Sequence, residues 1–406
     1  ATCNTGVGDR ALENLTTVST NVAIGTRSQQ NNTTGVCNTA VGFCALKANY
    51  RSCNNTAVGT CVLQNAGDFD NTTACNNTGI GALALCASTS AAFNTAVGAC
   101  AMQKTTTGAN NTAMGWESLV CNTTGYSTVA IGVESLRFQT SGSSNTGIGF
   151  RALCATTTAI RNTAVGSNSL RNNTTGTNNT AVGVDTQTAG TTAASNVAIG
   201  YNAEVAITTG ASNIAVGVSA GAGVTTGSAN VLIGHDSGSN ITTGGCNILI
   251  GDNVQSSDAA RNLEITISAK TGASSGKGQN TAFINPNGGA AYQGNNSSSW
   301  STTSDRRIKK NIVDNNTGLD KINQIQVKNF EYRTQDEVTD FQNSLAAYVD
   351  NPGVKLGVIA QEIELILPEV VREETTGVKT VDPSNLTYYL INAIKELKAR
   401  IETLEG

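Results

Sequence analysis

The chain is poor in several residue types that globular proteins use freely. Its 406 residues include one His and four Pro, with 13% charged and 4% aromatic residues. A net charge of −4 excludes the broad positive surface that binds nucleic acid. No run of 18 or more apolar residues occurs, so we expect no membrane insertion. Gly, Asn and Thr take the place of the missing types.

The eleven cysteines and His235 are the candidate metal ligands. No C-x-x-C pair occurs and a single His is a poor basis for a zinc site, so we expect no metal and no cofactor. The cysteines recur at fixed positions of the repeat described next, in the groups Cys44, Cys61, Cys100 and Cys3, Cys37, Cys246. We interpret them as small buried residues of a protein assembled in a reducing cytoplasm. Disulfides between chains are the alternative.

A 17-residue repeat dominates the first part of the chain. The pentad Asn-Thr-Ala-Val-Gly, with small variations, occurs 15 times, and its copies lie 17 residues apart except for one step of 22. The longer step places a five-residue insertion within residues 65–76. A disordered tract can share this composition, but it does not keep such a register. The repeat is already under way at Asn4, so we expect a fragment of a longer protein.

Each position of the pentad has a physical interpretation. Positions two and four are almost always β-branched, and side chains alternate across a strand, so both share one face. We assign that face to the inside of a coil. Position three is Ala or Gly until Leu232 and Leu249, and we expect it to face a neighbouring chain. The Gly suits a positive φ or a close backbone approach, and the Asn side chains suit ladders between coils.

One repeat therefore predicts a strand, a Gly corner, a second segment that carries Leu or Met four residues after the Gly, and a Thr-Thr-Gly turn. Such a unit buries its apolar face only by stacking. We predict an all-β fold: a parallel β-solenoid of 15 repeats over residues 1–251. A β-rich transition and connector follows over residues 252–303, with strands at Asn262–Ser268 and Thr281–Ile284.

The pentad followed by Ala-Leu resembles the head repeats of trimeric bacterial adhesins, and the same repeat occurs in viral fibre proteins. The resemblance covers about residues 4–251. It implies that the solenoid is a left-handed β-roll and that the protein is a homotrimer.

Residues 304–406 form a different kind of structure. They hold 13 Lys/Arg and 17 Asp/Glu, against 12 and 12 in residues 1–303. The segments Ser304–Ile312 and Gly357–Val371 resemble two motifs of the self-cleaving intramolecular chaperone of phage tail spikes and fibres, the peptidase S74 family. The resemblance implies a small α+β chaperone domain that drives trimer folding.

A heptad seam closes the chain, formed by Leu390, Ile394, Leu397, Ile401 and Leu404. Steps of four and three residues predict a coiled-coil helix. Attached to a trimeric solenoid, the seam predicts three parallel strands and a trimerisation role. The alternative is an amphipathic helix that packs on the core of its own domain.

The S74 resemblance also implies a Ser/Lys dyad, with Ser304 and Lys309 at the matching positions. A neutral Lys can activate a Ser nucleophile if burial or a neighbouring cation lowers its pKa, and Arg306, Arg307 and Lys310 supply cations. Attack of Ser304 Oγ on the Thr303 carbonyl passes through a five-membered ring, which favours cleavage of the Thr303–Ser304 bond. The alternative is a solvated basic turn. At most we expect single-turnover self-cleavage, with no external substrate.

These features predict the distal part of a trimeric viral tail fibre, located in the virion after assembly in the host cytoplasm. Its partners would be a host cell-surface receptor, glycan or protein, and other tail or fibre proteins. The alternative is a cell-surface or extracellular adhesive filament with a permanent trimerisation cap. An enzyme acting on polysaccharide is disfavoured, because the repeats carry no clustered carboxylates.

Overall fold

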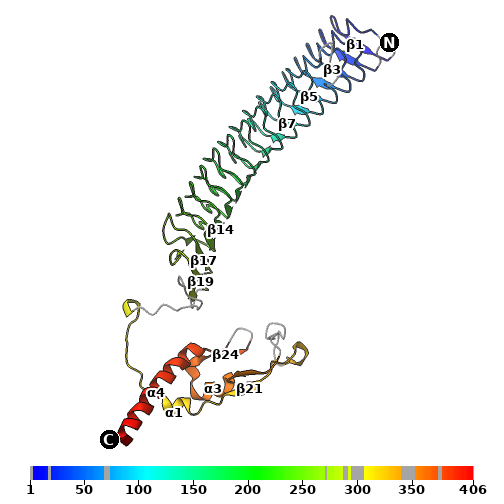
Figure 1. Cartoon of the computed structure of the whole chain (residues 1–406). Coiled ribbons are helices and arrows are strands. Elements are labelled where there is room, and N and C mark those ends of the chain that lie inside the picture. The colour runs from blue at the N-terminus through cyan, green and yellow to red at the C-terminus, as the bar shows by residue number, and fades with distance from the viewer. Residues whose placement is uncertain are drawn as a thin grey trace. The chain divides into compact units, whose positions relative to one another are not determined.

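The computed structural model describes residues 3–16, 20–67, 74–269, 272–286, 291–293, 306–339, 353–373 and 377–405. The chain divides into two compact units, Ala1–Thr303 and Ser304–Gly406. Figure 1 shows stacked coils in the first unit, from β1 to β19, and helices together with short strands in the second.

One parallel ladder organises the first unit. Each repeat contributes a three-residue strand, and successive strands pair with equivalent positions aligned, such as Ala40 with Ala57. The 22-residue step keeps this register, because Thr56 pairs with Thr78. The predicted parallel β-solenoid is thus confirmed. Its strands are β1 (Thr5–Val7), β2 (Val22–Ile24), β3 (Thr39–Val41), β4 (Thr56–Val58), β5 (Thr78–Ile80), β6 (Thr95–Val97), β7 (Thr112–Met114), β8 (Val129–Ile131), β9 (Thr146–Ile148), β10 (Thr163–Val165), β11 (Thr180–Val182), β12 (Val197–Ile199), β13 (Ile214–Val216), β14 (Val231–Ile233) and β15 (Ile248–Ile250).

The ladder continues beyond the last pentad. Strand β17 (Glu264–Ser268) pairs with β15, and β19 (Thr281–Asn285) pairs with β17, each in parallel and 17 residues further along. Both strands expected in this region are therefore present. Strand β20 (Ala291–Gln293) pairs antiparallel with β19, and β16 (Val254–Gln255) pairs with β18 (Ser274–Ser275).

The pentad faces the opposite way from the prediction. The position-three side chain of Ala40 is fully buried inside the coil, whereas the position-four side chains of Ile24 and Met114 are 40% and 46% exposed. The reason is the Leu or Met side chain that stands four residues after nine of the 15 pentad Gly residues and fills the interior. A Cβ on the position-three Gly147 would lie 3.1 Å from Leu136 Cδ1. The small third residue therefore faces its own core, not a neighbouring chain.

We call the position four residues after each pentad Gly the corner position. The large side chains at this position fill the coils and are fully buried: Leu46, Leu63, Leu85, Met102, Leu119, Leu136, Leu153 and Leu170. These residues adopt a left-handed backbone, with φ of 51° at Leu46. That conformation costs an ordinary residue about 1–2 kcal/mol, and burial of the Leu side chain offsets it. The pentad Gly is required by close approach, since a Cβ on Gly42 would lie 2.3 Å from the carbonyl oxygen of Gly59.

The predicted Asn ladder is confirmed, and it works mainly through the backbone. Asn38 N–H donates to Asn21 Oδ1 of the preceding coil at 3.0 Å, and Asn38 Nδ2 donates to the carbonyl of Ser52 at 2.9 Å. Each buried amide thus satisfies two backbone groups of the following coil, as Asn38 does for the Asn55 N–H and the Ser52 carbonyl.

Thr128 is the one pentad residue that breaks the ladder, and a nearby glutamine compensates for it. The fully buried Gln139 donates from Nε2 to Thr128 Oγ1 at 3.3 Å, and its Oε1 accepts from Asn145 Nδ2 at 2.9 Å. Gln139 thereby links the two sides of the gap.

All eleven cysteines lie in described residues, and no disulfide joins them within the chain. Cys44 and Cys154 are buried, but Cys3, Cys37 and Cys246 are exposed. Burial therefore accounts for only part of the cysteine pattern.

The second unit has a small core in which α3 and its following turn pack against α4. The buried residues Ile363, Leu367 and Val370 form this core. Strands β21 and β22 form one antiparallel pair, and β23 and β24 another. The elements are η1 (Arg306–Ile308), α1 (Leu319–Ile322), β21 (Lys328–Phe330), η2 (Gln335–Glu337), β22 (Lys355–Gly357), α3 (Ala360–Ile366), η3 (Pro368–Val370), β23 (Val371–Glu373), β24 (Lys379–Val381) and α4 (Pro383–Glu405).

Candidate functional site

The predicted dyad lies at the start of the second unit. Lys309 directly follows η1, where its N–H donates to the carbonyl of Arg306 at 3.2 Å. Its side chain is exposed in the single chain. Ser304 and the Thr303–Ser304 bond lie outside the described residues. The Ser304/Lys309 pair therefore stays a prediction that rests on the sequence motif.

The heptad seam lies on a long helix, α4, and on its exposed side. All five seam residues are at least 44% exposed. Ala393 lies on the other side of the helix and is buried. In the described part of the unit these side chains are not buried, which contradicts the interpretation that the seam packs into the core of its own domain.

The buried side of α4 is fastened to the segment around α1. Asn392 Nδ2 donates to the carbonyls of Asn315 at 2.7 Å and Thr317 at 3.2 Å. The approach is close, because a Cβ on Gly318 would lie 2.2 Å from the Ala393 backbone nitrogen. These contacts turn the seam away from the unit. Sequence reasoning missed them, because single long-range contacts leave no periodic signal.

Ion pairs and a lysine cap position α3. Lys321 Nζ donates to the carbonyl of Ile366 at the end of α3, at 2.8 Å. Lys379 pairs with Glu364 at 2.5 Å, and this carboxylate raises the pKa of Lys379. The helix that carries the second S74-like motif is thus held by one lysine that precedes it in the chain and one that follows it.

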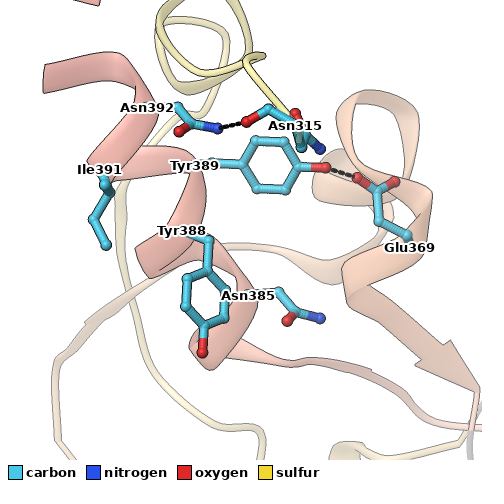
Figure 2. Close-up of a pocket in the computed structure, with 7 residues that line it drawn as sticks. All are labelled: Asn315, Glu369, Asn385, Tyr388, Tyr389, Ile391 and Asn392. Carbon is cyan, nitrogen blue, oxygen red and sulfur yellow. Dashed lines mark hydrogen bonds between the residues drawn. The ribbon is translucent and has the colours of Figure 1, made fainter. Parts of the chain in front are cut away.

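A cavity of about 400 Å³ opens beside the first half of α4 (Figure 2). Tyr389 O–H donates to Glu369, and this bond lowers the pKa of Glu369 and raises that of Tyr389. The other residues that line it are Asn315, Asn385, Tyr388, Ile391 and Asn392. Among the described residues the lining is mainly polar and aromatic, so the cavity offers a surface for packing or binding.

The outer face of the solenoid carries the second candidate site. Position-four side chains form an exposed apolar row along the ladder, here called the outer row: Val7, Ile24, Val58, Ile80, Met114, Ile148, Ile199, Ile233, Ile267 and Ile284. An exposed apolar surface of this length is typical of an interface. The β-branched residues at position four are the sequence signal for this row, and the prediction that they line the interior is wrong.

Charged groups of the solenoid are tied to one another where they cluster. Arg137 pairs with Glu117 at 2.6 Å and Glu134 at 3.4 Å, and Arg151 pairs with Glu134 at 2.6 Å. Among the described residues, no group of three or more His, Cys, Asp and Glu side chains is placed to hold a metal ion. The described part of the chain also contains no helix with the length and apolar character needed to cross a membrane.

Comparison with known proteins locates one family. Residues 304–372 match the peptidase S74 model, described as the chaperone of endosialidase. Searches of curated proteins and of solved structures found no match to the chain. The matched segment runs from the predicted dyad through α3 and into β23. The resemblance predicted from two short motifs is confirmed: the chain joins a long parallel β-solenoid to a C-terminal segment of the endosialidase-chaperone family.

Proposed function

We propose that the protein is the host-attachment part of a homotrimeric viral tail fibre, and that its C-terminal unit is a chaperone that assembles the trimer. The observation that carries the proposal is the family match at residues 304–372, directly after a solenoid with an apolar outer row. A chaperone of this kind accounts for how three long, repetitive chains find one register. The site of action is the virion, and the receptor is a molecule of the host surface.

The outer row supports the homotrimer. Side chains such as Ile148 and Ile199 recur with the 17-residue period, so a second and third copy of the same chain present matching rows in the same register. The exposed seam of α4 provides a second self-complementary surface in the other unit. Two apolar surfaces in different units then serve one assembly.

We further propose that the chaperone cuts itself off after assembly. Ser304 Oγ attacks the Thr303 carbonyl while Lys309 accepts the hydroxyl proton, and the acyl group moves from nitrogen to oxygen before water releases it. Removal of the chaperone would leave the solenoid unable to refold, which makes assembly effectively irreversible. Without cleavage, the unit would be the permanent cap of an adhesive filament.

Mass determination of the purified full chain, native and denatured, tests both proposals. We expect a native trimer and a denatured fragment of about 103 residues that begins at Ser304. Ser304→Ala and Lys309→Ala should each keep the chain at full length, because either change removes half of a unit that acts together. Ser301→Ala and Lys310→Ala are the matched controls and should still be cut. A monomeric wild type contradicts the trimer, and an uncut trimer contradicts the cleavage.

A further inference from the structure

The core of the solenoid has two sections that are filled in opposite ways. In the first, which runs from Ala40 to Ala181, corner Leu or Met residues fill the coil. In the second, the strand residue Leu232 fills it, and a Cβ on the corner residue Gly238 would lie only 2.6 Å from Leu232 Cδ2. Large and small residues have exchanged positions between the two sections.

Gln187 and Glu204 occupy the corner position in the two coils between these sections. Glu204 is fully buried, and Gln187 is 1% exposed. Gln187 Nε2 donates to Glu204 Oε2 at 2.6 Å. The remaining oxygens, Gln187 Oε1 and Glu204 Oε1, have no hydrogen-bond partner. Two buried acceptors of one hydrogen-bonded pair are thus left over, which is costly in an apolar interior.

The corner position does not itself cause this deficit. Gln29 occupies the same position in an earlier coil, and both of its polar ends are paired: Oε1 accepts from Asn32 Nδ2 at 2.9 Å, and Nε2 donates to the carbonyl of Val22 at 2.9 Å. The two unpaired oxygens therefore result from placing an amide next to a carboxylate, which has no hydrogen to donate.

Among the described residues, no charged group is placed to neutralise Glu204. Between Asp185 and His235 the sequence contains only two titratable side chains, Glu204 itself and the exposed Tyr201. Asp185 accepts a hydrogen bond from Asn168 instead. The following coil offers no room for a cation, since a Cβ on Gly221 would lie 2.8 Å from Leu232 Cδ1 and 3.3 Å from Glu204 Cγ.

We propose that Glu204 is a proton-binding site, and that in the folded solenoid its carboxylic acid forms a cyclic pair with the Gln187 amide. A proton taken from solvent onto Glu204 Oε1 lets this O–H donate to Gln187 Oε1, while Gln187 Nε2 continues to donate to Glu204 Oε2. One proton satisfies both leftover oxygens, and no other bond changes. Burial, which raises the pKa of Glu204 to about 7 against the opposing hydrogen bond from Gln187, agrees with this geometry.

The proton makes this part of the solenoid sensitive to pH. An exposed Glu has a pKa of 4.5, so between pH 4.5 and about 7 the folded coil keeps a proton that an opened coil loses. The stabilisation that this proton gives to the folded coil is therefore fully present below pH 4.5, and it is lost as the pH rises to about 7. The equilibrium for local opening should increase roughly 70-fold between pH 5 and pH 8.

Hydrogen exchange of the full chain, read by mass spectrometry and corrected for intrinsic rates, tests the proposal. Peptides over residues 187–221 should lose protection from pH 5 to pH 8 relative to those over residues 119–153. Glu204→Gln replaces the acid by an amide that keeps both hydrogen bonds, and it should abolish this relative loss. Glu13→Gln is the matched control, because Gln30 donates to Glu13 across adjacent coils in the same way but on the exposed surface.

Infrared spectra of the wild type give a second readout that does not depend on the variant folding. A protonated-carboxyl band that titrates near pH 7 is expected, and Glu13→Gln should retain it. The proposal is wrong if the relative protection of residues 187–221 is independent of pH, or if no such band titrates above pH 6.

Discussion

The solenoid and the C-terminal unit bury apolar surface by different means. In the solenoid each coil covers the next one, so Leu46 and Ala40 are fully buried although one repeat has only 17 residues. In the C-terminal unit the core is small, and Leu356 and Leu365 are 75% and 88% exposed. Repetition lets one chain complete its own core. Both units also present exposed apolar side chains, in the outer row and in the α4 seam, that other chains would cover in the proposed trimer.

The largest effect should come from a charged substitution in the α4 seam, the apolar surface that the C-terminal unit presents to other chains. Leu397→Asp places a charge in the α4 seam, where three copies would bring three charges together. We expect loss of the trimer, and with it loss of cleavage at Ser304, as measured by native and denatured mass. Ala399→Asp adds the same charge at an exposed position outside the seam and should leave both intact. Trimers of Leu397→Asp that are still cut would show that the seam is not needed.

The next largest effect is expected inside the solenoid, where the position-three and corner side chains of a coil share one interior space. Ala113→Leu overpacks a coil already filled by Leu119 and should lower the free energy of unfolding by about 1–3 kcal/mol. Leu119→Gly alone should cost about 2–5 kcal/mol through the cavity that it leaves. The double variant recreates the arrangement of Leu232 and Gly238, so it should recover about 1–3 kcal/mol of the summed loss.

Urea unfolding of the four proteins in this cycle measures the coupling. The position-four residue of the same strand supplies the control, since Met114 is exposed and Met114→Leu should not couple to Leu119→Gly. Strict additivity of Ala113→Leu and Leu119→Gly would mean that these side chains do not share one interior space.

Much of the solenoid could be predicted from its period, but the direction of its strands could not. Alternation determines which residues share a face, and it leaves open which face is inside. The corner residues decide that question, because Leu46 fills the space that Thr39 and Val41 were expected to occupy. The sequence did contain a clue: Leu232 and Leu249 appear at position three only where Gly221, Gly238 and Gln255 replace the corner leucines.

The C-terminal unit was predictable where motifs or heptads extend over many residues. The segment Gly357–Val371, which carries the second S74-like motif, leads from the end of β22 into α3. The exposure of the seam was not predictable, because it depends on how α4 packs through Asn392 and Ala393. The dyad at Ser304 and Lys309 stays a prediction that rests on the family resemblance.

The smallest effect is expected at Thr128, the one pentad position where the Asn ladder is interrupted and where Gln139 supplies the linking hydrogen bonds. Equivalent coils carry Asn at the position of Gln139, as Asn122 and Asn173 do. Gln139→Asn should be too short to reach both Thr128 Oγ1 and Asn145 Nδ2, which leaves a buried polar group unpaired and costs about 1 kcal/mol. Thr128→Asn alone should crowd Gln139 and cost a similar amount. The double variant restores the common arrangement and should unfold at the wild-type urea concentration, which gives a coupling of about 1–2 kcal/mol. If the two single losses simply add, Gln139 is an ordinary buried amide and the ladder tolerates its gap without help.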